Sequence, residues 1–173
     1  MMVHNIRAQD AMRSAQEKED KGVIKMTDVS LGYTVRDVVT GFEGMTVAVA
    51  KYMYGCTQYK VQPKTKDGNY TEAEWLDEPQ LEIVDKGTDI KVLDFEFDFG
   101  DEVIDIISKF RGKIVCKISY LYDGIRYEVQ PECDKNDFKD AKWIPEGRIK
   151  LIKKNDEVEE SEPRYGGFRP KLE

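Results

Sequence analysis

Apolar and polar residues alternate along most of this chain in short runs bounded by glycine or proline, a pattern typical of β-strands. Two regions carry the pattern, 32–84 and 100–152, and each predicts five short strands with tight turns. The five strands are expected within four runs of each region. These runs are 32–41, 45–54, 57–63 and 74–84 in the first region and 100–110, 113–124, 125–131 and 141–152 in the second. We therefore expect a mainly β protein.

The two regions, here called the first and second copy, are one 53-residue segment written twice at an offset of 68 residues, without a gap. Fifteen positions are identical, mostly glycines, aromatics and aliphatics. They are Gly32/Gly100, Val35/Val103, Asp37/Asp105, Phe42/Phe110, Gly44/Gly112, Val47/Val115, Tyr52/Tyr120, Tyr54/Tyr122, Tyr59/Tyr127, Val61/Val129, Gln62/Gln130, Pro63/Pro131, Ala73/Ala141, Trp75/Trp143 and Glu78/Glu146. Such residues fix turns and fill cores, so the duplication predicts architecture, namely two tandem SH3-like small barrels.

Particular residues mark the turns of each barrel. Gly44 and Gly112 predict a bulge or a close strand approach that a Cβ would obstruct. Reversals between the second and third strands are expected at 54–55 and 123–124, the latter an Asp-Gly pair.

A proline ends the third strand in each copy, since proline cannot donate to a ladder. Pro63 and Pro131 occupy these positions, and polar loops of equal length, 64–74 and 132–142, follow them. Variable loops of equal length are places where partner contacts sit.

The expected domain organisation is an arm over 1–28, a first barrel over 30–86, a second over 90–153 and an extended tail over 154–173. The arm predicts a short helix over 5–21, with a thin apolar stripe that fits either a polar arm or one that docks on a partner.

The tail is acidic and then rich in glycine and proline. It fits either disorder or a peptide-like arm in which Tyr165 and Phe168 anchor in a neighbour's groove.

The connector between the copies ends in a run, 90–99, in which apolar and acidic residues alternate with period two. It predicts a strand leading into the second barrel. Glu96 and Asp98 then form a solvated face opposite the three phenylalanines of this run.

Composition is that of a soluble globular protein, with 40% hydrophobic and 35% charged residues. No apolar run suits a bilayer span and the N-terminal residues lack a secretory leader pattern, so we expect a protein made and kept in a cytoplasm. Three cysteines, Cys56, Cys116 and Cys133, fall at unrelated positions of the two copies and predict reduced thiols.

The net charge of -7 is unevenly spread: the first copy carries 5 basic and 8 acidic residues, the second 10 of each. Neither copy is a basic stripe of the kind that binds phosphates, which makes nucleic acid the weakest partner class. Equal folds with unequal surface charge predict that the two barrels contact different partners.

The sequence offers little for catalysis or for a bound cofactor. Its one histidine, His4, lies in the arm, so neither a nucleophile and base pair nor a zinc site is assembled, and no phosphate-loop pattern occurs. We predict no catalytic residue, no metal and no cofactor.

Carboxylates are the remaining candidates for a chemical role. An acidic run could in principle hold Mg²⁺ or Ca²⁺, and it consists of Glu96, Asp98, Asp101, Glu102 and Asp105. A solvated face is the favoured interpretation. The duplicated Asp37/Asp105 and Glu78/Glu146 are expected to bond turn amides.

Aromatic side chains are the predicted partner-binding groups. Tyr52 and Tyr54, and Tyr120 and Tyr122 in the second copy, would lie on one face of a strand and form a groove that grips a peptide. Core filling is the alternative for these pairs, and the favoured interpretation for Trp75/Trp143.

The first copy reads GxxVxDxxTGFxG, then YxxGCxxYxVQP, then EWxDExxLExV. This string resembles a family of small, mostly uncharacterised proteins of tailed bacteriophages and prophages. It is carried by Gly32, Val35, Asp37, Thr40, Gly41, Phe42, Gly44, Tyr52, Gly55, Cys56, Tyr59, Val61, Gln62, Pro63, Glu74, Trp75, Asp77, Glu78, Leu81 and Glu82.

The second copy departs from the string at Lys109, at Asp123-Gly124 and at Pro145. The resemblance covers residues 30–152 and implies phage origin and a barrel fold, without an active site.

Together these features predict a non-enzymatic bacteriophage protein, an accessory or connecting structural component of the virion that acts through protein–protein contacts. Its partners would be other phage proteins, such as a capsid or tail lattice, with oligomers formed through assembly. The alternatives are an intracellular phage factor that binds a host protein or small ligand, for example a host-defence inhibitor, and a nucleic-acid-binding regulator.

Overall fold

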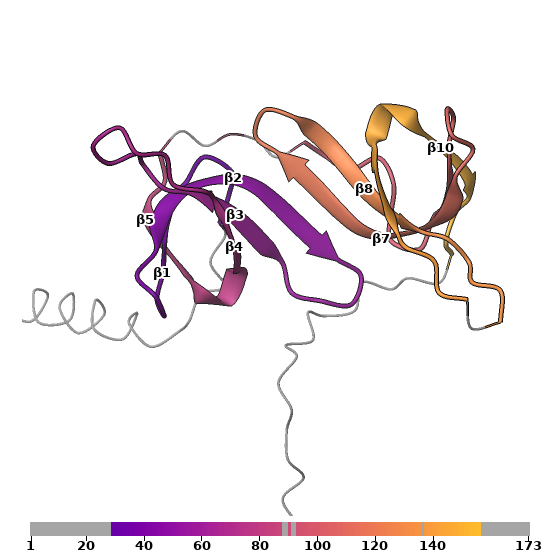
Figure 1. Ribbon diagram of the computed structural model, residues 1–173, viewed down its shortest axis with the longest axis horizontal. Helices are drawn as coiled ribbons and strands as arrows, with labels where there is room; N and C mark the ends of the chain where they lie inside the picture. The colour runs from indigo at the N-terminus through magenta and orange to yellow at the C-terminus, as the bar shows by residue number, and fades with distance from the viewer. Residues whose placement is uncertain (1–28, 88–89, 91–92, 136, 157–173) are drawn as a thin grey trace, which may run out of the picture.

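A computed structural model describes residues 29–87, 90, 93–135 and 137–156, and this part of the chain is mainly antiparallel β-structure (Figure 1). The mainly β prediction is confirmed. The arm over 1–28 with its predicted helix, the tail beyond residue 156, and with it Tyr165 and Phe168, lie outside the described residues.

Each copy forms five strands and one short 3-10 helix in the same order. The first copy contains β1 (Thr34–Asp37), β2 (Glu43–Tyr52), β3 (Gln58–Gln62), β4 (Glu74–Asp77), η1 (Glu78–Gln80) and β5 (Leu81–Asp85). The second contains β6 (Glu102–Asp105), β7 (Arg111–Tyr120), β8 (Gly124–Gln130), β9 (Lys142–Pro145), η2 (Glu146–Arg148) and β10 (Ile149–Lys153).

The strands pair in matching order in the two copies. In the first copy the order is β5-β1-β2-β3-β4, and in the second it is β10-β6-β7-β8-β9, with every pair antiparallel. The same sequence pattern thus produces the same pairing twice.

The two copies are joined by their longest strands, because β2 also pairs with β7. Ala50 lies opposite Ile118, which is the same position of the other copy, and the pair Ala48 and Tyr120 is matched by Tyr52 and Cys116. A local half-turn therefore relates the copies, and in Figure 1 the hairpin of β2 and β3 and the hairpin of β7 and β8 point past each other in opposite directions. This junction, here called the seam, merges the strands into one sheet.

Each copy has its own apolar core. The first gathers around Val35, Tyr59 and Val61, and the second around Val103, Tyr127 and Val129, all at matching positions. One matching position differs in kind, since Val49 lies in the first core whereas Lys117 takes its place in the second, buried to 9% exposure.

The predicted lead-in strand over 90–99 is wrong. Residues 93–99 carry no strand, although Phe95, Phe97 and Phe99 contact the second core while Glu96 and Asp98 are exposed as expected. A further strand cannot pair with β6, because β6 already pairs with β10 on one side and with β7 on the other. The period-two spacing of the phenylalanines therefore comes from an irregular segment that packs on the second core.

Turn residues act as predicted. A Cβ on Gly44 or Gly112 would overlap the carbonyl oxygen of Gln62 or Gln130 on the neighbouring strand, so the close strand approach is confirmed. The third strand of each copy ends immediately before its proline, and the reversals at 54–55 and 123–124 join the expected strands.

Candidate functional site

The two tyrosines of each predicted pair lie in different surroundings, one on the seam and the other in the turn that follows. Tyr52 and Tyr120 end β2 and β7 and pack on the seam, together with Trp75, over buried side chains that come from both strands. Those side chains are Ala48, Ala50, Cys116 and Ile118. The hydroxyl of Tyr52 bonds the Gln58 Oε1 at 3.1 Å, and the Arg126 guanidinium lies over the Tyr120 ring at 5.5 Å. These two tyrosines cover the junction.

Core filling, the interpretation favoured for the tryptophans, is wrong for Trp143 and holds in part for Trp75, which packs against the buried residues of the seam rather than in the core of its own copy. Leu76 and Ile144 contact the two cores, and adjacent residues of a strand point to opposite faces. Trp75 therefore packs on the seam with Lys60 5.9 Å above its ring, and Trp143 is 43% exposed.

Tyr54 and Tyr122 do not share a strand face with Tyr52 and Tyr120, because they lie in the turns that follow β2 and β7. They are 90% and 87% exposed. Burial of a tyrosine ring stabilises a fold, so two equivalent tyrosines left in solvent are available to a partner.

Each turn rests against the opposite copy. The Met53 amide donates to the Val115 carbonyl at 2.9 Å, and the Leu121 amide donates to the Val47 carbonyl at 2.9 Å. These two bonds occupy equivalent positions, so they extend the half-turn relation past the paired strands. Tyr54 is thereby placed over the second copy and Tyr122 over the first.

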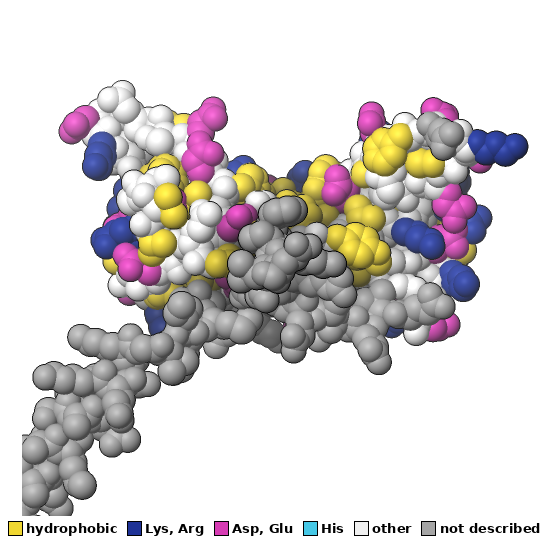
Figure 2. All heavy atoms as spheres, turned by 90° about the horizontal axis from the view of Figure 1, so that it is seen from below, with side chains coloured by type: hydrophobic (Ala, Val, Ile, Leu, Met, Phe, Trp, Pro, Cys, Tyr) yellow, Lys and Arg dark blue, Asp and Glu magenta, His cyan; other side chains and the backbone are white. Residues whose placement is uncertain are grey.

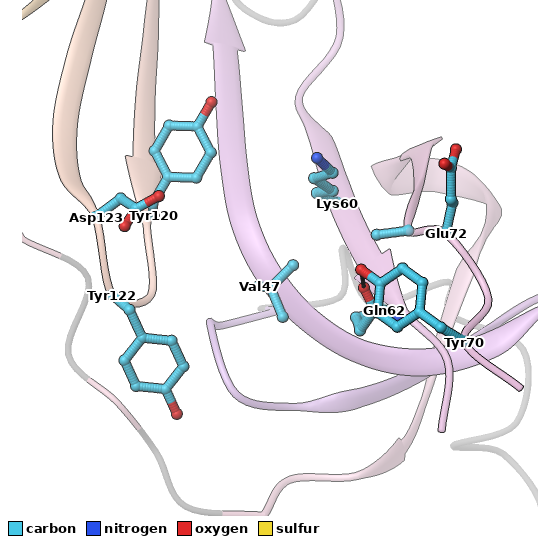
Figure 3. A pocket seen from close by; sticks show the side chains of 9 residues that line it. Val47, Lys60, Gln62, Tyr70, Glu72, Tyr120, Tyr122 and Asp123 are labelled. Atoms are coloured by element: carbon cyan, nitrogen blue, oxygen red, sulfur yellow. Dashed lines mark hydrogen bonds between the residues drawn. The ribbon is translucent and has the colours of Figure 1, made fainter. Parts of the chain in front are cut away.

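An open groove results on the first copy, with a volume of about 610 Å³. Figure 3 shows Tyr120 and Tyr122 on one side, Gln62 and Tyr70 on the other, and Val47 between them. Lys60, Glu72 and Asp123 bring charges of both signs to this first groove.

A second groove of about 460 Å³ lies on the other copy and shares three matching positions with the first. Val115, Gln130 and Tyr54 line it, and they are the counterparts of Val47, Gln62 and Tyr122 in the first groove. These three shared residues are uncharged. Neither groove belongs to one copy alone, since each takes its tyrosine from the turn of the other.

The duplicated glutamines hold the polar loops in place. The Nε2 of Gln62 donates to the Thr71 carbonyl at 2.8 Å, and that of Gln130 donates to the Lys139 carbonyl at 2.7 Å. These carbonyls are equivalent, and each follows directly on an aromatic residue. The fixed loops present Tyr70 at 75% exposure and Phe138 at 78%.

Figure 2 shows the two copies rising as lobes on either side of a hollow, with hydrophobic side chains on its floor and on the lobe walls. Exposed aromatics of the turns and loops occur at matching positions of both copies. The molecule therefore presents its aromatic surface in duplicate.

Asp37 and Asp105 bond turn amides, as predicted. Asp37 accepts hydrogen bonds from the Val39 amide at 3.1 Å and from the amide and hydroxyl of Thr40, and the Thr40 hydroxyl and Val39 amide hold the pKa of Asp37 below its usual value. These bonds stabilise the charged carboxylate.

Asp105 makes the matching bonds to Ile107 and Ser108 and also a bidentate ion pair with Arg148. Arg148 and then the Ser108 hydroxyl hold its pKa far below the usual range. Both aspartates thus fix turns.

Glu78 and Glu146 each lie within hydrogen-bond distance of a tyrosine hydroxyl of their own copy. The Tyr127 hydroxyl donates to Glu146 at 2.8 Å, and the Tyr59 hydroxyl lies 3.4 Å from Glu78. Tyr127 is fully buried, and burial raises its pKa far above the ordinary value. For Glu146, the predicted turn role gives way to a bond with Tyr127, a residue 19 positions away in the sequence that the folding of the copy brings to the carboxylate.

The second core accommodates the charged side chain of Lys117. Its ammonium lies 5.2 Å from the Phe95 ring and 4.4 Å from the Phe99 ring, and 3.6 Å from Asp98. Burial lowers its pKa, and Asp98 partly offsets this effect. The aromatic rings and Asp98 compensate for a charge where the first core has a valine.

The acidic run does not form one site. Glu102 pairs with Arg111, Asp105 with Arg148, and Asp98 with Lys117 and Lys154. Among the described residues, no cluster of three histidines, cysteines or carboxylates is arranged to hold a metal ion.

The cysteines are free thiols, as predicted. Burial, the main cause, raises the pKa of Cys116 to about 12, which keeps it protonated at neutral pH. Within the described ranges, no helix is long and apolar enough to cross a membrane.

No protein-family model, curated protein or solved structure matches this chain.

The grooves were found only in part from the sequence. Tyr54 and Tyr122 were expected at a binding surface, whereas Val47, Val115 and the bracing glutamines were noted only as repeated residues. The signal for Tyr70 and Phe138 was present, since both loops keep an aromatic at one position while their neighbours change.

Proposed function

We propose that this protein is a non-enzymatic bacteriophage protein, an accessory or connecting component of the virion that holds other phage proteins through protein–protein contacts. The phage origin and the virion location rest on the sequence resemblance. The observation that carries the binding role is a pair of grooves that share three matching positions, each flanked by an exposed tyrosine from the other copy.

Each copy is, in this proposal, a small SH3-like barrel. The support is the strand order, in which the first strand pairs with the second and the fifth, and a 3-10 helix separates the fourth from the fifth. Such barrels recur among binding proteins, although a fold by itself does not define a function.

Binding is favoured over catalysis because four ionisable groups with displaced pKa values, Asp37, Asp105, Tyr127 and Lys117, are engaged in structural contacts. Asp37 and Asp105 fix turns, Tyr127 bonds Glu146, and Lys117 sits among phenylalanine rings. None of these four lines either groove. An acid or base for catalysis would need to face the space where a substrate binds.

Quantitative mass spectrometry of purified virions tests the proposal. We expect the protein in particles at a fixed copy number per particle, retained after a salt wash. Its absence from washed particles, together with presence in infected cells, would overturn the virion role.

The alternative is an intracellular phage factor that binds a host protein or a small ligand. One observation favours it: groove volumes of about 610 and 460 Å³ fall within the size range of small-molecule sites. Thermal denaturation of the full chain with a metabolite library would reveal such a ligand as a rise in Tm. A nucleic-acid-binding regulator is the weakest candidate, because the charges at the first groove are mixed and the chain carries a net charge of -7.

A further inference from the structure

The two grooves share three uncharged lining positions and differ in their other lining residues, charged ones included. Valine, glutamine and tyrosine recur at three matching positions. Lys60 lines the first groove, whereas the matching position of the second copy is Glu128. A ligand that recognises the shared lining depends little on charge.

The shared lining has survived in loops and turns that otherwise changed. Around Tyr54 and Tyr122, Gly55 is replaced by Asp123 and Cys56 by Gly124. The loop aromatic is kept as Tyr70, which lines the first groove, and as Phe138, which lies outside the lining of the second; both are mostly exposed and so are not needed to fill a core. Two copies of one segment thus keep solvent-exposed aromatics where stability does not require them.

The half-turn relation fixes how the two sites are oriented. Because Ala50 lies opposite its own counterpart Ile118, a direction along the first groove that runs in the plane of the sheet is reversed in the second. Two identical segments bound in these grooves would therefore run in opposite directions.

We propose that one chain binds two copies of the same uncharged, extended polypeptide segment, one in each groove, running antiparallel and each held by the tyrosine of the opposite copy. This rests on the proposed binding function and names its partner class: a protein that displays one segment at least twice, as a dimer or a lattice does. Unequal surface charge predicted different partners for the two barrels, but that argument does not apply to grooves that take residues from both.

An extended peptide fits the grooves better than a nucleic-acid strand does. Base stacking on tyrosine needs a positive track for the phosphates, whereas Lys60 is set against Glu72 and Asp123 in the first groove and Lys113 against Glu132 in the second. Tyrosine and the amides of glutamine and the backbone suit a neutral peptide with apolar side chains.

The test uses the full chain and a displayed library of random peptides. Selection on the parent protein is combined with counter-selection on the double variant Tyr54→Ser/Tyr122→Ser, and the enriched peptide is synthesised for isothermal titration calorimetry. Both tyrosines are exposed, so the variants are expected to fold, which circular dichroism checks. A matched control, Val39→Ser/Ile107→Ser, removes exposed apolar side chains of similar accessibility outside the groove linings.

We expect a stoichiometry of two peptides per parent chain and per control chain, one per chain for either single tyrosine variant, and affinity weaker by roughly tenfold or more at each altered groove. A stoichiometry of one for the parent, equal binding by the double variant, loss of both sites in one single variant, or no enriched peptide would overturn the inference. So would a single-stranded oligonucleotide that binds with the same tyrosine dependence, measured by fluorescence anisotropy.

The two proposals fail separately. A protein found in virions that binds no peptide loses this inference and keeps its proposed function. A protein that binds two peptides but is absent from virions keeps the inference as an intracellular factor.

Discussion

The two copies of the repeated segment reach the same fold with different means of stabilising it. Both use an aspartate to fix the turn after the first strand, yet only Asp105 adds an ion pair, with Arg148. The first core holds Val49 where the second holds Lys117. Shared residues therefore specify the backbone path, and the differing ones set how each copy responds to pH and substitution.

The seam is a third region that belongs to neither copy. Its residues also differ, with Ala50 facing Ile118, but its geometry is symmetric because equivalent strands meet. From that symmetry come two grooves rather than one. The variants below ask how far the equivalence of the copies extends.

The largest effect is expected at the close strand approach. Gly44→Ala and Gly112→Ala should each lower the free energy of unfolding by about 3 kcal/mol, because backbone atoms of the neighbouring strand must move to admit a Cβ. Urea denaturation measures it. Gly147→Ala, where a Cβ meets open space, should change stability by less than about 0.5 kcal/mol. A loss of stability in only one of these two variants would show that the copies are not equivalent at this position.

The next largest effect is expected in acid, where the two copies should differ in the pH at which they unfold. The lowered pKa of Asp105 means that its stabilisation is complete above the unfolded-state pKa of about 3.9 and is lost as pH falls through the folded-state value. Arg148→Gln removes the main cause of that lowering, so the second copy should unfold at a higher pH than in the parent.

Tryptophan fluorescence in a Trp75→Phe background follows this transition, because Trp143 then reports on the second copy alone. Arg36→Gln is the matched control, since Arg36 pairs with Glu43 and Glu82 at the exposed surface of the first copy and such pairs contribute little. An acid transition of the second copy unchanged by Arg148→Gln would contradict this account of Asp105.

A smaller effect is expected where the turn glycine of the first copy is a lysine in the second. Gly41 has φ 76° and Lys109 has φ 64°, a region that costs a side-chain-bearing residue about 1 kcal/mol. Lys109→Gly should raise the free energy of unfolding by about 0.5 kcal/mol after the entropy of the added glycine is counted, and Gly41→Lys should lower it by about 1 kcal/mol. Opposite signs would show that the two turns differ.

The smallest effect concerns the buried lysine. Lys117→Met should leave stability unchanged or raise it by up to about 1 kcal/mol, since burial of the ammonium opposes folding and an apolar side chain of similar size removes that cost. Because the folded-state pKa is lowered, parent stability should rise as pH increases from that value to about 10.4. Lys150→Met, at an exposed position of β10, is the control. A clear loss on Lys117→Met would mean that the aromatic contacts outweigh desolvation.

Much of the fold within each copy could be predicted, because its causes are local. Turn glycines, Pro63 and the alternation of apolar residues act over a few residues. The strand over 90–99 was mispredicted because period-two burial also arises when Phe95, Phe97 and Phe99 dock as an irregular segment on a finished core.

The seam and the grooves lay beyond the sequence pattern. Nothing in the alternation of β2 distinguishes an edge that pairs with β7 from one that meets solvent, since edge pairing depends on tertiary position. Tyr54 and Tyr122 were identified by residue type, whereas their placement over the opposite copy follows from bonds such as Met53 to Val115. The half-turn relation could not be predicted before the register was known.

The central claim is that the two copies form one body across the seam, and amide hydrogen exchange of the Met53 and Leu121 amides tests it most directly. Each of these amides donates across the seam to a carbonyl of the opposite copy. We predict that both exchange as slowly as amides within the paired strands of the two copies. Exchange at the rate of an unprotected amide, while those strands stay protected, would show two independent units and contradict the account of the grooves.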